Sequence, residues 1–147
     1  MRPRVSGFTL VELMIVIAVI AVIAAIAVPN LIAARKTANE AAAIGSLRTL
    51  VTAQTMFRES DKDGNGADYA GTLTQLGTYR LIDPTLASGT KQGYDFEIGV
   101  ATAYDWNVQA YPVSPGRSGD RYFFTDESGV IRFNRTAPAT VNDPPIP

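Results

Sequence analysis

The first part of the chain is a stretch of apolar residues long enough to cross a membrane. Residues 8–28 are apolar at every position except Thr9 and Glu12. At about 1.5 Å per residue, a helix of this length measures roughly 32 Å, close to the hydrocarbon thickness of a bilayer. The pattern therefore predicts a transmembrane helix over residues 8–28.

Beyond Pro29 the pattern becomes amphipathic. Six apolar residues recur at the spacing of one helix face, namely Ala43, Ile44, Leu47, Leu50, Val51 and Phe57. The charged residues of this segment lie largely off that face, namely Arg35, Lys36, Glu40, Arg48, Arg58 and Glu59. The polar, glycine-containing residues 61–66 end the pattern. We therefore expect one nearly continuous helix over residues 8–59.

The second half of the chain has the alternation typical of β-strands. Four short runs alternate apolar and polar residues, namely 94–101, 104–113, 121–126 and 129–133. Residues 102–103 and 127–128 separate them into two hairpins, and Gly129 can adopt a positive φ in the second turn. The fold class predicted is α+β, with a long N-terminal helix packed on a small antiparallel β-sheet. The first half of that helix is transmembrane and the second half amphipathic.

The final segment is rich in proline. Residues 136–147 hold four of the chain's nine prolines, and such a segment is expected to be extended on the surface or mobile. The organisation predicted is a short leader over residues 1–7, the transmembrane helix over 8–28, and an α+β head over 29–147 that includes this tail.

Composition excludes several classes of function. The chain has 13 Lys+Arg and 14 Asp+Glu, so its net charge of −1 favours no nucleic-acid partner. It has no cysteine, and therefore neither a disulfide framework nor a thiolate metal site. It also has no histidine, which removes zinc triads and Ser–His or Cys–His catalysis. We expect no enzymatic activity.

The residues before the apolar run indicate how the chain reaches a membrane. Arg2 and Arg4 make the N-terminal leader basic, and a basic segment before an apolar stretch is typical of a membrane anchor or a secretory signal. The alternative to an anchor is a secretory cut after Ala27, which would release a soluble domain beginning at Val28. That cut would require an n-region containing the acidic Glu12.

Glu12 needs an explanation, because a charge within hydrocarbon costs about 2.5–3.5 kcal/mol on insertion scales. One interpretation is a capping box, in which Thr9 and Glu12 satisfy each other's backbone N–H groups at the helix start. The other is a cationic partner within the membrane. A cut after Gly7 would create an α-amino group on Phe8, and the geometry favours pairing between Glu12 and the Phe8 amine of a neighbouring chain.

Residues 7–30, with the sequence GFTLVELMIVIAVIAVIAAIAVPN, resemble the class III signal segment of type IV pilins and type II secretion pseudopilins. The resemblance implies that a membrane aspartyl peptidase, the prepilin peptidase, cuts after Gly7 and N-methylates Phe8. Glu12 matches the acidic residue that pairs with a neighbouring amine in that family. Pro29 matches a proline at which the long helix bends or loosens.

The resemblance also implies a function. Members of this family are structural subunits that an assembly platform in the bacterial inner membrane extracts from lipid into a homo-oligomeric helical filament. The chain would first be a single-pass inner-membrane protein with a periplasmic head, and then part of a filament in the periplasm or at the cell surface. A pseudopilin of a type II secretion system is the alternative within the family. A membrane-anchored or secreted binding module is the alternative outside it.

A polar stretch over residues 61–69 matches part of a calcium-binding loop. Its residues at positions 1, 3 and 5 of that pattern are Asp61, Asp63 and Asn65. Gly66 occupies position 6, but Thr72 stands where a bidentate glutamate belongs at position 12, so that Asp68 would have to substitute. The alternative is a plain turn that ends the helix. Calcium is thus the one candidate cofactor.

Overall fold

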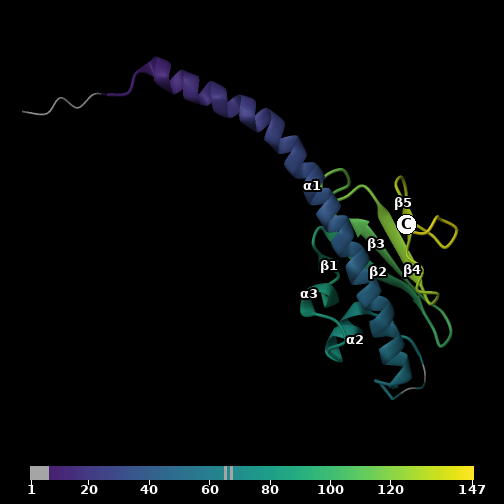
Figure 1. Cartoon of the computed structure of the whole chain (residues 1–147). Coiled ribbons are helices and arrows are strands. Elements are labelled where there is room, and N and C mark those ends of the chain that lie inside the picture. The colour runs from purple at the N-terminus through teal and green to yellow at the C-terminus, as the bar shows by residue number, and fades with distance from the viewer. Residues whose placement is uncertain (1–6, 65, 67) are drawn as a thin grey trace, which may run out of the picture. The chain divides into compact units, whose positions relative to one another are not determined.

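The computed structural model describes residues 7–64, 66 and 68–147. The chain divides into two compact units, Met1–Ala34 and Arg35–Pro147, and the second unit is called the head below. One helix, α1 (Leu10–Glu59), contributes residues to both units. Figure 1 shows α1 together with the shorter helices and the strands of the head.

The long helix predicted from the sequence is confirmed. It begins at Leu10, two residues later than expected, because Thr9 caps it from outside: the Glu12 N–H donates to Thr9 Oγ1 at 3.2 Å. Pro29 lies inside the helix. Proline lacks an N–H and so removes one intrahelical hydrogen bond, yet α1 continues through this position to Glu59.

Within the head, α1 is amphipathic. One face is buried, and its residues recur every three or four positions: Glu40, Ala43, Ser46, Leu47, Leu50, Ala53, Gln54 and Phe57. Ile44 and Val51 pack beside this face. Glu40 is a correction to the sequence prediction, which placed this residue off the buried face. It tolerates burial because its carboxylate accepts hydrogen bonds from another part of the head.

The sheet has five antiparallel strands, each paired with the next along the chain, rather than the four expected. They are β1 (Thr90–Lys91), β2 (Tyr94–Ala101), β3 (Trp106–Pro112), β4 (Tyr122–Asp126) and β5 (Arg132–Asn134). Every second residue of β3 is buried, beginning at Trp106. This alternation places one face of the sheet in the core and confirms the α+β class.

Both hairpin turns are longer than predicted. β2 has the expected bounds, but β3 begins at residue 106 instead of 104, because Thr102 Oγ1 accepts hydrogen bonds from the backbone N–H groups of Tyr104 and Asp105 at 3.2 and 3.0 Å. In the second turn the Asp126 C=O accepts from the Gly129 N–H at 2.9 Å, and Gly129 has the positive φ expected of it. As a result β5 spans 132–134 rather than 129–133.

Two short helices that the sequence analysis did not predict connect α1 to the sheet. They are α2 (Leu73–Thr78) and α3 (Pro84–Ala87). Each has an N-cap side chain: Thr72 Oγ1 accepts from the Gln75 N–H at 3.1 Å, and Asp83 Oδ1 accepts from the Leu86 N–H at 3.0 Å. They bring Leu76 and Leu86, both fully buried, into the core.

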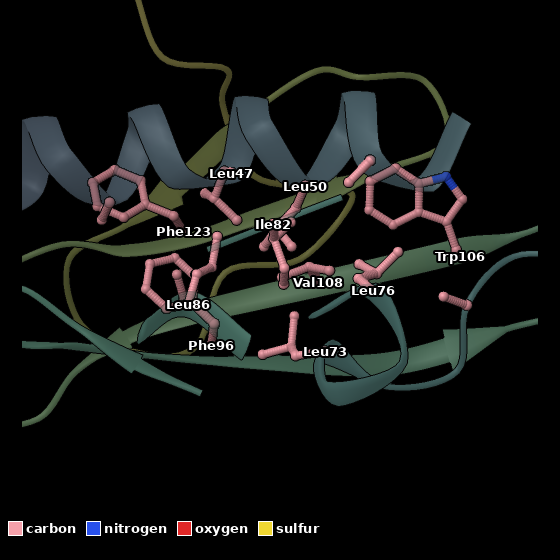
Figure 2. Packing of buried hydrophobic residues seen from close by; sticks show 14 of the residues in the cluster. Leu47, Leu50, Leu73, Leu76, Ile82, Leu86, Phe96, Trp106, Val108 and Phe123 are labelled. Carbon is pink, nitrogen blue, oxygen red and sulfur yellow. The ribbon is translucent and has the colours of Figure 1, made fainter. Parts of the chain in front are cut away.

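The core lies between α1, the two short helices and one face of the sheet. Figure 2 shows Leu50 of α1 above Val108 of the sheet, and Phe123 of the sheet beside Leu47 of α1. Burial of one large apolar side chain contributes about 1.5–3 kcal/mol. The buried apolar residues of the described chain all belong to the head, so the head carries the hydrophobic core.

The proline-rich tail, residues 136–147, turns at Thr140–Asp143, and its last residues lie along the edge of the sheet beside β5. The Ile146 N–H donates to the Ile131 C=O at 2.9 Å, and the Phe133 N–H donates to the Pro144 C=O at 3.1 Å. The Ile146 side chain packs against the core cluster, and Ala139 is buried. Of the two states expected of the tail, the structure shows the one that lies on the surface.

Candidate functional site

A capping box forms the start of α1. Glu12 Oε2 accepts hydrogen bonds from the Thr9 backbone N–H at 2.9 Å and from Thr9 Oγ1 at 2.7 Å. In return, Thr9 Oγ1 accepts from the Glu12 N–H at 3.2 Å. The carboxylate therefore caps its own helix, as the first interpretation of Glu12 requires. This pairing involves one chain and leaves open what Glu12 does beside a second chain.

The apolar part of α1 is exposed in the part of the chain that the structure describes. An 18-residue window of α1 near its N-terminus has a mean hydropathy of 3.0 and no buried residue. Leu10 is 74% exposed and Ile26 is 64% exposed. A core helix of a soluble protein of this apolarity would be largely buried. In the part of the chain that the structure describes, α1 is the one helix long and apolar enough to cross a membrane.

Gly7 and Phe8 are both exposed, and the Phe8 side chain is 84% exposed. The rest of the expected leader, including Arg2 and Arg4, lies outside the described residues. A Cβ placed on Gly7 would meet no atom within 4 Å, and Gly7 does not have a positive φ. Nothing in the fold of the described chain therefore requires glycine at position 7. This is expected if the glycine is there to be recognised by another protein rather than for folding.

The acidic loop after α1 uses its carboxylates in hydrogen bonds. Asp61 Oδ1 accepts from the Gly66 N–H at 3.1 Å, and Asp63 Oδ2 accepts from Gln75 Nε2 at 3.0 Å. Asn65 lies outside the described residues. Among the residues that are described, no three acidic, histidine or cysteine side chains are grouped as a metal site. Calcium binding by this loop stays a prediction from the sequence.

A charged junction between α1 and the loop before β4 was missed by sequence reasoning. Glu40 Oε2 accepts from Arg121 Nε at 2.7 Å, and Glu40 Oε1 accepts from the Asp120 N–H at 2.8 Å. The Tyr94 hydroxyl donates to the Arg121 C=O at 2.8 Å. Burial, reinforced by the negative charge of Glu40, raises the pKa of Tyr94, so this hydroxyl stays protonated. These contacts connect α1 to the residues just before β4.

Comparison with known proteins identifies the family. Residues 2–28 match the family model of the prokaryotic N-terminal methylation motif. The chain is 35% identical over 131 residues to the type IV wide pilus major component PilA4 of Thermus thermophilus, and the match covers 88% of both chains. It is 42% identical over 129 residues to the type IV major pilin protein PilA of Myxococcus xanthus, covering 87% of this chain and 55% of that protein. The chain belongs to the type IV pilin family.

The family assignment confirms the resemblance expected from residues 7–30. It also agrees with the fold, in which a long N-terminal helix packs on an antiparallel sheet. Both relatives are named as major pilus or pilin proteins, and neither is named as a secretion pseudopilin or as an enzyme. The pilin interpretation is therefore favoured over the pseudopilin alternative, and this pilin is a structural protein.

Proposed function

We propose that this pilin is the repeating subunit of a type IV filament, held together by the apolar part of α1. The observation that carries the proposal is the exposure of that segment: its window of mean hydropathy 3.0 has no buried residue in the single chain. Such a surface requires either lipid or other apolar helices around it. Lipid surrounds it before assembly, and copies of the same segment surround it in the filament.

Processing precedes assembly in this proposal. The prepilin peptidase cuts after Gly7 and methylates the new amine of Phe8. The match of residues 2–28 to the N-terminal methylation motif supports this cut over a secretory cut after Ala27. Before the cut the chain is a single-pass protein of the inner membrane with its head in the periplasm, and the assembly platform then moves it into the filament. The role is structural and includes no catalytic step.

Glu12 has two functions in this account. Among the described residues, both hydrogen bonds to its carboxylate end at Oε2, so that Oε1 stays open to a cation from another chain. The cation is the Phe8 amine of a neighbouring subunit. Removing one member of a buried ion pair costs about 3–5 kcal/mol, because the other charge is left without a partner. The same carboxylate can thus cap its own helix and select the register of its neighbour.

The experiment that tests this proposal compares Glu12→Gln with Thr9→Val. Glu12→Gln keeps a side chain that can close the capping box but removes the charge. Thr9→Val removes the hydroxyl that caps the helix and keeps the carboxylate. Both variants are expressed in the native host, cleavage is scored by intact mass, and filaments are scored in the sheared fraction.

We expect Glu12→Gln to be cleaved and to stay in the membrane with few or no filaments. We expect Thr9→Val to be cleaved and to form filaments, because its charge pair is intact. A normal filament yield from Glu12→Gln would mean that the carboxylate serves the helix and not its neighbour. Absence of any filament containing the unmodified chain would refute the proposal as a whole.

A further inference from the structure

The last residues of the tail pair with β5 in the manner of a short additional strand. Arg132 and Pro145 face each other as an antiparallel bridge. The two hydrogen bonds on either side of this pair are Ile146 N–H to Ile131 C=O at 2.9 Å and Phe133 N–H to Pro144 C=O at 3.1 Å. Residues 144 and 146 therefore direct their backbone polar groups toward β5, and residue 145 directs its own away from the sheet.

The outward edge of this strand has no N–H group to offer. Residues 143, 145 and 147 occupy the positions whose backbone nitrogen faces outward. Pro145 and Pro147 have no N–H. The Asp143 N–H donates to the Thr140 C=O at 3.1 Å, so it is already used within the tail. Pro145 and Pro147 are exposed, so the prolines are not there to fill the core.

Specific contacts hold the tail in this position. Asp143 Oδ1 accepts from Asn134 Nδ2 at 2.8 Å, and the Asp143 C=O accepts from Arg132 Nη1 at 3.0 Å. Asp143 Oδ2 also accepts from the Thr140 N–H at 2.7 Å. Ile146 packs against the core cluster. The tail is thus anchored at both ends of the segment that pairs with β5.

An open strand edge is a template for pairing with another chain, and proline on the edge is one way in which proteins prevent this. The opposite edge of the sheet, β1, is only two residues long, and its Lys91 is paired with Asp83 at 2.8 Å. We propose that residues 144–147 are an edge-closing strand: the β5 edge binds the chain's own tail, and the outward prolines prevent a second copy from extending the sheet. This inference does not depend on filament assembly.

The test restores the missing donors in the full chain, kept in detergent. Pro145→Val with Pro147→Thr adds two outward N–H groups. Pro144→Val is the matched control, because its new N–H would face inward toward the Phe133 C=O. The measurement is hydrogen exchange of single amides by NMR at two protein concentrations, together with the sedimentation of each variant. Every variant keeps residues 8–28, so any association through that helix is common to all.

We expect the double variant to associate, with protection of the amide introduced at position 145 rising at least tenfold at the higher concentration. Pro145→Val alone should show the same change to a smaller extent. Pro144→Val should sediment like the unmodified chain, and the Ile146 amide should be protected in all of them. Association of Pro144→Val as strong as that of the double variant would overturn the proposal. So would a double variant that does not associate although its Ile146 amide is protected, or rapid exchange at Ile146 in the unmodified chain.

Discussion

Glu40 and Arg121, which are 81 positions apart in the sequence, form a carboxylate–guanidinium pair at 2.7 Å in the head. The side chains are 11% and 23% exposed. The guanidinium also lies over the rings of Phe123 and Phe133, at 5.3 and 5.4 Å from their centroids. One partly buried ion pair therefore connects α1 to the residue before β4, and its guanidinium packs on side chains of β4 and β5.

Glu40→Gln should destabilise the head by about 2–4 kcal/mol, because it leaves the partly buried Arg121 without its counter-ion. Lys36→Gln is the control: Lys36 pairs with Asp120 at 2.7 Å, but the more exposed pair should contribute less than about 1 kcal/mol. Denaturant unfolding of the chain in detergent, followed by the fluorescence of the buried Trp106, measures both losses. Equal losses would mean that the Glu40–Arg121 pair contributes no more than a surface pair.

Gly119→Ala should destabilise the head by about 2–3 kcal/mol or prevent folding. A Cβ at this position would lie 2.0 Å from the Tyr94 hydroxyl oxygen, and that side chain is held by its hydrogen bond to the Arg121 C=O. Gly71→Ala is the matched control, because a Cβ there meets no atom within 4 Å. Thermal unfolding of the two variants should separate them clearly. Similar midpoints would show that Tyr94 moves aside readily.

Acid should loosen the tail. The Thr140 backbone N–H, together with the side chains of Thr140 and Asn134, stabilises the Asp143 carboxylate and lowers its pKa from the ordinary 3.8. A carboxyl group whose pKa is lower in the folded state contributes stability above its unfolded pKa and loses it as the pH falls through the folded pKa. The stability that the ionised Asp143 carboxylate contributes to the folded tail is therefore complete at neutral pH and is lost as the pH falls below 3.8.

The NMR shift of the Ile146 methyl groups, which pack against the core cluster, reports tail docking during an acid titration. We expect a transition below pH 3.8 in the unmodified chain. Asp143→Asn should remove that transition, because the side chain no longer titrates. An identical transition in the variant would assign the effect to another carboxyl group.

If the acidic loop binds calcium, a chelator should lower the melting temperature of the chain. Asp63→Ala should then remove the difference in melting temperature between the calcium-loaded and the chelated protein. Asp63 Oδ2 accepts a hydrogen bond from Gln75 in the described chain. Gln75→Ala is therefore the control, because it removes this contact and leaves the carboxylate for the ion. A melting temperature that responds to neither calcium nor chelator would leave residues 61–69 as a turn.

The sequence predicted the parts of the fold that depend on local pattern. The α1 helix and β2 follow from periodicity that extends over many residues, and β2 matched its expected bounds. The short helices α2 and α3 were missed because six and four residues are too few for a periodic signal. Their capping residues, Thr72 and Asp83, and Pro84 in the first turn of α3 were local indications of a helix start.

The remaining differences arise from contacts between distant segments. Glu40 is buried because Asp120 and Arg121, which are about 80 positions later in the sequence, form hydrogen bonds with it from the loop before β4. The tail pairs with β5 although proline is unfavourable in strands, because Pro145 faces away from β5 and the inward Pro144 still accepts a hydrogen bond from the Phe133 N–H through its C=O. At the site itself, Gly7, Phe8 and Glu12 were read from the motif. A single chain shows the capping box of Glu12 but contains no neighbouring amine.

The filament account is tested most directly by the intact mass of this chain in filaments sheared from its native host. The account predicts that the subunit begins at Phe8 and carries one methyl group on its new amine. A filament subunit that still begins at Met1 would contradict it. So would a chain that is found only as a soluble species beginning at Val28.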